Sequence, residues 1–198
     1  MNERFGKRFF RPILVFCLIV LAAAALQPAA PSRAQDAPQG PQHEALARQL
    51  ADWGLFRGTG QGFELERGSN RVEALVMLLR LLGAEQEALQ QYASEIAHPF
   101  RDVPAWADPY VSYAYANKLT NGMSADRFGS QEPVTVREYF TFVLRALGYS
   151  DAAGAERDFD WRESVRKALD IGMEEARAYL DDNLADSPLI RDQLVHIS

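Results

Sequence analysis

A block of residues from the first half of the chain recurs in the second half with the same order of residue types. The segment 71–83 falls on the segment 136–148, and in both of them apolar residues return at the spacing i, i+3, i+4 and i+7. This spacing is typical of an amphipathic α-helix. Units that recur along a chain usually bury their apolar faces only against one another. The repeat therefore predicts an all-α fold of helical units that share one core.

The two recurring helices also have the same signals at their starts. Asn70 and Thr135 stand directly before them, and Glu73 and Glu138 follow three residues later. This is the capping-box pattern, in which the side chain of each partner bonds to the backbone N–H of the other. A glycine follows each apolar run, at the place where a left-handed residue commonly ends a helix.

A shorter helix precedes each closing helix, so the plan is three helix-loop-helix units. In the middle unit we expect Asp108 to cap this helix and Val111, Ala114 and Tyr115 to face inward. The third unit is the weakest copy, because only about two turns remain for its closing helix before residue 198. We expect the closing helices to pack together at the centre.

Residues 1–34 are predicted to be a secretory signal peptide. A basic start precedes a short apolar run, Ile13 to Leu26, and small residues lead up to Ala34. The run is shorter than the roughly 20 residues of a membrane span, so we expect no span after cleavage; an uncleaved anchor is the alternative. Cleavage after Ala34 would remove five basic residues and one acidic residue, changing the formal net charge from −6 to −10. Residues 35–42 are then a tether to a domain at 43–198.

The rest of the chain shows little sign of catalytic or metal chemistry. Its single cysteine, Cys17, lies in the predicted signal peptide, and His43, His98 and His196 lack a metal-ligand spacing. The acidic run at 181–183 lacks the spacing and the glycine of a calcium loop, and we interpret it as a solvated turn. The negative net charge argues against nucleic-acid binding. We therefore expect no cofactor, no metal and no enzyme, with a wall-modifying enzyme as the weakest alternative.

The middle unit carries an ordered series of short motifs. It opens with Phe100-Arg101-Asp102-Val103 and a Trp106-Ala107 pair, passes through the turn 119–122, and closes with the helix start 135–138 and the end 144–148. This series resembles the S-layer homology domain, whose repeat has an aromatic-x-Asp-Val opening, a Trp-Ala pair, a Leu-x-x-Gly turn and a Thr-Arg-Ala-Glu helix start. Two less regular copies extend the resemblance over residues 43–198.

The resemblance implies a triangular bundle of three pseudo-repeats, at about 43–84, 99–149 and 158–198. It also implies noncovalent attachment to bacterial cell-wall polysaccharide, often an anionic secondary polymer that carries pyruvyl groups. In the family, grooves between repeats are lined by the helix-start arginine and by the aspartate and tryptophan of the opening segment. Carried over, the ligand-binding positions are Arg71, Asp102, Trp106, Arg137, Trp161 and Arg191.

The carry-over is uneven, so we expect at most one or two working grooves. Arg71 and Arg191 stand at the motif position, but in the second unit that position is Val136 and the arginine is shifted to Arg137. One residue is a turn of about 100° on a helix, so this arginine is expected to aim elsewhere. The first unit lacks the opening segment altogether.

The predicted function is anchoring at the bacterial cell wall or cell surface through an acidic glycan. An arginine fork matches the two oxygens of a carboxylate, and a tryptophan such as Trp106 can stack on a sugar ring. A surface-layer protein or another secreted protein is the expected further partner. The alternative is a secreted scaffold whose degenerate repeats bind another protein and have lost the glycan.

Overall fold

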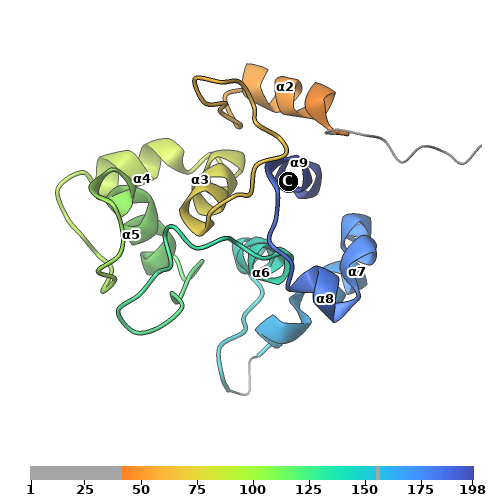
Figure 1. The fold of residues 1–198 in the computed structure, drawn as a ribbon. Coiled ribbons are helices and arrows are strands. Elements are labelled where there is room, and N and C mark those ends of the chain that lie inside the picture. Colours follow the sequence, from red (N-terminus) through yellow and green to blue (C-terminus); the bar gives the residue numbers. More distant parts are fainter. Residues whose placement is uncertain (1–41, 155–156) are drawn as a thin grey trace, which may run out of the picture. The chain divides into compact units, whose positions relative to one another are not determined.

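The computed structural model describes residues 42–154 and 157–198, which form helices joined by turns and loops. The predicted signal peptide at 1–34, and the predicted tether at 35–42 except for its last residue, lie outside this part. None of the described helices is long and apolar enough to cross a lipid bilayer. They are α2 (Glu44–Asp52), α3 (Arg71–Leu81), α4 (Glu85–Gln91), α5 (Asp108–Ala116), α6 (Val136–Ala146), α7 (Ser164–Asp170), α8 (Asp182–Ala185) and α9 (Arg191–Ile197), with the 3-10 helices η1 (Ala105–Ala107), η2 (Trp161–Glu163) and η3 (Glu174–Tyr179) (Figure 1).

Helices α3 and α6 begin with the predicted capping boxes. The Asn70 side chain accepts a hydrogen bond from the Glu73 backbone N–H at 2.9 Å, and the Glu73 carboxylate accepts from the Asn70 N–H at 3.3 Å. Thr135 and Glu138 make the same pair of bonds, at 3.3 and 2.9 Å. Each box satisfies two backbone groups that a bare helix end would leave unpaired.

The same two helices end at the predicted glycines. Gly83 has a φ of +70° and Gly148 a φ of +91°, values that favour glycine. The leucines just before them are more exposed than the apolar spacing predicts: Leu82 is 45% exposed and Leu147 is 57% exposed. They fall on the cap residue, where the chain already turns away from the helix axis.

The start of α5 differs from the prediction. Asp108 is the first residue of the helix, and Ala107 is the residue before it, with no side-chain cap. The reason is η1, which runs directly into α5 and already bonds the Ala107 N–H to the Pro104 carbonyl at 2.7 Å. Tyr115 was expected to face inward but is exposed.

The residues that lead into α3, α6 and α9 are joined in a closed ring of backbone hydrogen bonds. Ser69 N–H donates to Leu189 O at 2.8 Å, Leu189 N–H donates to Val134 O at 2.8 Å, and Val134 N–H donates to Ser69 O at 3.1 Å. The first N–H of each helix is also bonded to a carbonyl of a neighbouring lead-in segment, at 2.9 to 3.2 Å. These bonds fix the three helix starts relative to one another.

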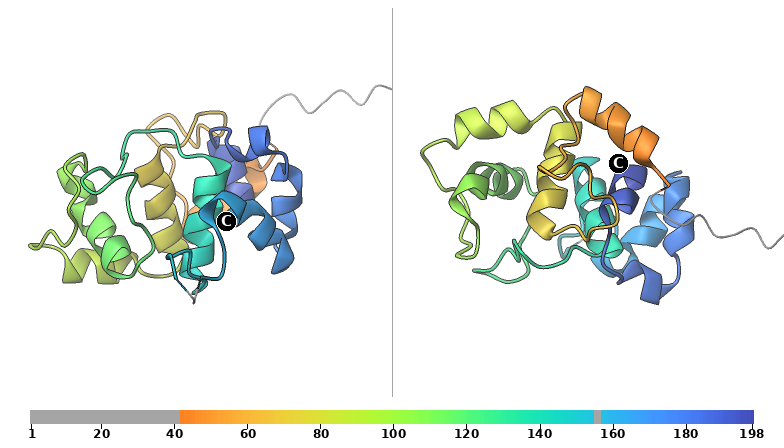
Figure 2. Two further views of the ribbon diagram at one scale, coloured as in Figure 1. Left: turned by 90° about the horizontal axis from the view of Figure 1, so that it is seen from below. Right: turned by 45° about the horizontal axis from the view of Figure 1, so that its top comes forward.

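Each closing helix packs against the opening helix of another unit. Helix α3 packs against α5, α6 against α7, and α9 against α2, while α3 and α6 also contact each other. Figures 1 and 2 show α3, α6 and α9 between the other helices. The largest fully buried side chains come mainly from these closing helices and their lead-in segments: Val72, Leu75, Leu79, Val134, Tyr139, Phe140, Phe142, Leu144, Leu189 and Leu194.

Candidate functional site

A groove of about 490 Å³ lies where α3, α6 and η2 meet. Three distant stretches of the chain reach it, because α3 and η2 both pack against α6. We call it the Arg71 groove, after the first residue of α3. It brings together Arg71 and Trp161, two of the predicted site residues, from the first and third predicted units. Asn121, Glu138, Phe142 and Arg145 also line it.

The guanidinium of Arg71 is held in an aromatic setting. The side chain is only 7% exposed, and its charged group lies 4.6 Å from the ring centre of Phe142 and 5.4 Å from that of Phe128. Its Nη1 atom is 2.9 Å from Oε1 of Glu138. The Asn70 cap fixes the first turn of α3, so the position of Arg71 follows from local backbone geometry.

One donor of this arginine is buried without a partner. Nε has no hydrogen-bond partner among the described residues, whereas Nη1 is paired with the Glu138 carboxylate at 2.9 Å. Burial lowers the pKa of the Arg71 guanidinium, and the nearby Glu138 carboxylate partly opposes this effect. Arginine nevertheless keeps its charge at neutral pH. A buried charge with a free donor favours an additional anionic partner.

Trp161 and an arginine ion pair complete the Arg71 groove. Trp161 is 43% exposed, and the Arg162 guanidinium lies 4.8 Å from the centre of its ring. Arg145 is fully engaged: it binds the Asp151 carboxylate through two bonds of 2.8 and 2.7 Å and donates to the Leu119 carbonyl at 3.2 Å. The groove therefore offers one arginine with a free donor and one partly exposed indole.

The structure places the Asp102 carboxylate against a backbone segment. Asp102 is not among the groove-lining residues; its carboxylate accepts backbone hydrogen bonds from Phe128, Gly129 and Ser130 at 2.7, 2.6 and 3.2 Å. Burial raises the pKa of Asp102, but these three bonds together outweigh it, so the pKa lies below its ordinary value. Since the Phe128 ring lies beside Arg71, Asp102 helps to hold one of the aromatic rings around the Arg71 guanidinium in place.

We expect Asp102→Asn to lower the free energy of unfolding by about 0.5–1.5 kcal/mol at neutral pH, because an amide cannot accept all three bonds, while water that reaches the exposed Asp102 offsets part of the loss. A depressed folded-state pKa contributes stability above the unfolded value of about 4, and that stability is lost as the pH falls through the folded pKa. The difference between variant and wild type should therefore shrink in acid. Urea unfolding at neutral and acidic pH measures it, with Asp126→Asn as the surface control. An equal loss at both pH values would contradict this role.

A second groove, of about 160 Å³, has the corresponding residues of the first unit along its wall. We call it the Arg191 groove. Arg191, the first residue of α9, is buried, and burial lowers the pKa of its guanidinium. It donates to the Phe63 carbonyl at 2.8 Å and to the Arg57 carbonyl at 2.7 Å. The Arg191 groove is also lined by Glu73, Met77 and Arg80. These residues are the repeat counterparts of three residues of the Arg71 groove, Glu138, Phe142 and Arg145.

Trp106 lines the Arg191 groove but lies mostly in solvent. Its side chain is 56% exposed and meets the Tyr110 ring edge-on at 6.4 Å. The structure thus brings Trp106 together with Arg191 in this groove, whereas Asp102, its neighbour in the sequence motif, is not among the lining residues. The two grooves have similar walls, but in the smaller one the arginine is already bound to backbone oxygens.

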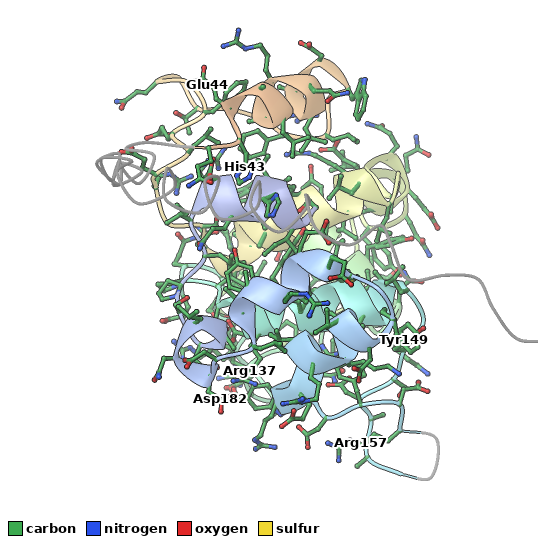
Figure 3. All side chains as sticks on the ribbon, turned by 90° about the vertical axis from the view of Figure 1, so that its right-hand side faces the viewer. His43, Glu44, Arg137, Tyr149, Arg157 and Asp182 are labelled. Atoms are coloured by element: carbon green, nitrogen blue, oxygen red, sulfur yellow. The ribbon has the colours of Figure 1, made fainter. Side chains whose placement is uncertain are left out.

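Arg137 lies in neither groove. It donates to Asp186 at 2.6 Å and to Asp182 at 2.9 Å, and these contacts hold α8 against the start of α6 (Figure 3). Its bonds to Asp186 and Asp182 outweigh burial and raise the pKa of the guanidinium. The acidic turn at 181–183 therefore contains a partner of this arginine.

Sequence reasoning missed a third groove, of about 600 Å³, between the residues just before α2, the end of η3 and α9. His43 is one of the residues that line it (Figure 3). The Nδ1 atom of His43 lies 2.8 Å from Asp192 Oδ2, and the His43 ring stacks on the His196 ring with 4.3 Å between the ring centres. Its lining residues include Gln193 at the position of Glu73 and Glu138, and no arginine. The only signal in the sequence was the pair of histidines near the ends of the predicted domain. Within residues 42–154 and 157–198, no group of three metal-binding side chains comes together.

Comparisons with known proteins match the middle of the chain to a protein family. Residues 99–135 match the S-layer homology domain. A "Cell surface protein" of Thermoanaerobacter kivui is 29% identical over 164 residues, 81% of this chain and 20% of that protein. A "Surface layer protein" of Brevibacillus choshinensis is 31% identical over 140 residues, and a "Middle cell wall protein" of Brevibacillus brevis is 28% identical over 109. The matches cover 66% and 54% of this chain, and 12% and 10% of those relatives.

This chain therefore spans a fifth or less of the length of these relatives. The matches support the predicted location at the bacterial cell surface or cell wall and a role in surface anchoring.

Proposed function

We propose, from the S-layer homology domain that this chain carries, that it attaches to the cell surface by binding an acidic wall polysaccharide in the Arg71 groove. The single observation that carries this proposal is the buried Arg71 Nε, which has no hydrogen-bond partner among the described residues. The Nε–H bond of a guanidinium is parallel to one N–H bond of Nη2, and the two oxygens of a carboxylate match this pair in shape and charge. Arg71 is also in the first turn of a helix, where the helix dipole favours an anion.

Trp161 supports a sugar rather than a bare ion as the ligand. The Trp161 ring is partly exposed where it lines the groove, and the Arg162 guanidinium lies over this ring. A flat apolar ring face suits the C–H face of a pyranose, while the acid group of the same sugar reaches Arg71. We propose that these two residues bind the ligand, with Asn121 as a further polar contact.

The other predicted site residues have supporting roles in this proposal. Asp102 positions the 128–130 segment, Arg137 holds α8, and Arg191 ties the start of α9 to the loop at 57–63. Trp106 borders the smaller groove, whose arginine is already satisfied. We therefore assign the principal site to the Arg71 groove and retain three repeats, at about 43–84, 99–149 and 158–198, as our division of the domain.

The negative charge of the chain does not prevent such binding. The formal net charge is −6, or −10 after the proposed cleavage, so a polyanion is repelled at long range. At physiological salt this repulsion is largely screened beyond about 8–10 Å. Local contacts then decide affinity, and a wall that presents many copies of the glycan adds avidity.

Cosedimentation with purified bacterial walls tests the proposed function. We expect the protein to pellet with walls that retain their secondary polysaccharide and to stay in solution with walls from which that polymer has been chemically removed. Free polysaccharide should compete in proportion to its acid content. Equal pelleting with both wall preparations would contradict glycan binding, and wall-independent capture of one secreted protein would favour the scaffold alternative.

A further inference from the structure

Inside the Arg71 groove, the position that a ligand acid would take beside the arginine is already shared with a carboxylate of the protein. Oε1 of Glu138 lies 2.9 Å from Nη1 of Arg71. The other oxygen, Oε2, accepts the Thr135 backbone N–H at 2.9 Å as part of the capping box. Because the cap holds it, Glu138 cannot swing away from Arg71 without breaking the start of α6.

The charges around this site balance one another. Arg71 faces Glu138, and Arg145 is engaged with Asp151 through two bonds. Asp102 also acts on Arg71 at longer range. A ligand carboxylate that reaches the free donor of Arg71 therefore comes close to the Glu138 carboxylate, and two like charges at such a distance repel each other.

The corresponding glutamate in the other groove is arranged differently. Glu73, the repeat counterpart of Glu138, has the same capping-box bonds, but its carboxylate pairs with Arg67 at 2.8 Å. Arg191 is bound instead to two backbone carbonyls. A glutamate that pairs directly with the groove arginine is therefore a feature of the Arg71 groove, and Glu73 provides a matched comparison within the same chain.

We propose that Glu138 is the specificity-determining residue of this groove, because it competes with the ligand acid for Arg71. The proposal rests on the function proposed above. A small free carboxylate gains only the contact with Arg71 and meets the charge of Glu138, so it is rejected. An acid carried on a sugar also gains the contact with Trp161 and with the groove wall, and these contacts offset the repulsion. The groove thus selects acidic glycans over the small organic acids of the surroundings.

The test is Glu138→Gln in the full chain, since glutamine keeps the shape and the capping bond but removes the charge. The probes are polysaccharide extracted from bacterial walls that carry surface-layer proteins, the same polymer with its carboxyl groups reduced to alcohols, and free pyruvate. We expect the variant to bind the acidic polymer about 3- to 10-fold more tightly, as removal of a partly screened like charge implies. Binding of the reduced polymer should be unchanged, and pyruvate should inhibit the variant but not the wild type.

Two further variants separate charge from structure. Glu73→Gln, the matched capping glutamate, should leave all three measurements at wild-type values. Glu138→Asp keeps the charge and should retain the wild-type rejection of pyruvate. Melting curves establish that each variant is folded at the assay temperature.

The outcomes distinguish the two proposals. If the wild type binds the acidic polymer and Glu138→Gln binds it no more tightly and still ignores pyruvate, competition by Glu138 is overturned while glycan binding stands. If the wild type binds neither form of the polymer, both proposals are overturned.

Discussion

Replacing Arg71 with alanine is expected to abolish retention on bacterial walls, with a loss of binding of about 30-fold or more. Truncating one partner of a buried charge contact costs about 2–5 kcal/mol, and here the lost guanidinium carries the unpartnered Nε donor. Arg71→Lys should restore only part of the binding, since an ammonium cannot make the two parallel bonds of a guanidinium. Cosedimentation with walls over a range of wall concentrations gives the affinity.

The matched control for this variant is Arg191→Ala. Arg191 is also the buried first residue of a closing helix, but its guanidinium is bound to the carbonyls of Phe63 and Arg57. We expect this change to lower the melting temperature and to leave the wall binding of the folded protein within about threefold of wild type. If Arg191→Ala abolishes binding and folded Arg71→Ala does not, the ligand binds in the Arg191 groove and not in the Arg71 groove.

The helices and their starts were predictable because their signals are local. The capping boxes at Asn70 and Thr135 involve residues three positions apart, and the glycines Gly83 and Gly148 act on their own backbone. Such short-range preferences need no knowledge of the rest of the fold. Asp108 was misjudged because a 3-10 helix ran into α5, and such a tight turn has no distinctive spacing in the sequence.

The site was less predictable because its partners are distant in sequence. Arg71 and Arg191 are equivalent by motif, yet one pairs with Glu138 and the other with the carbonyls of Phe63 and Arg57, which lie 128 and 134 residues away. The motif includes the glutamate at position 138, but it does not specify that this glutamate pairs with the arginine of another unit. The groove beside His43 was missed for the same reason, since its contact with Asp192 joins residues 149 positions apart. A motif thus identifies which residue types are present, while tertiary packing decides which of them keep free donors.

Gly122→Ala is expected to cause the largest loss of stability among single changes at the rim of the Arg71 groove. The residue has a φ of +75°, and a Cβ atom there would lie 2.3 Å from a ring carbon of Phe100 and 2.8 Å from the Arg127 carbonyl oxygen. The backbone strain costs about 1–2 kcal/mol and the clash a further 1–3 kcal/mol, so we expect a total of about 2–5 kcal/mol. Urea unfolding followed by circular dichroism measures the free energy of unfolding.

Gly148→Ala separates the two contributions to that loss. Gly148 also has a positive φ, of +91°, but no described atom lies within 4 Å of a Cβ built there, so only the backbone cost of about 1–2 kcal/mol is expected. The clash at Gly122 should also weaken wall binding, because Phe100 packs against Phe128, one of the rings beside Arg71. Equal losses in the two variants would mean that the Phe100 ring moves aside at little cost. The Arg71 groove would then tolerate movement of its aromatic wall, and its selectivity would have to come from charge alone.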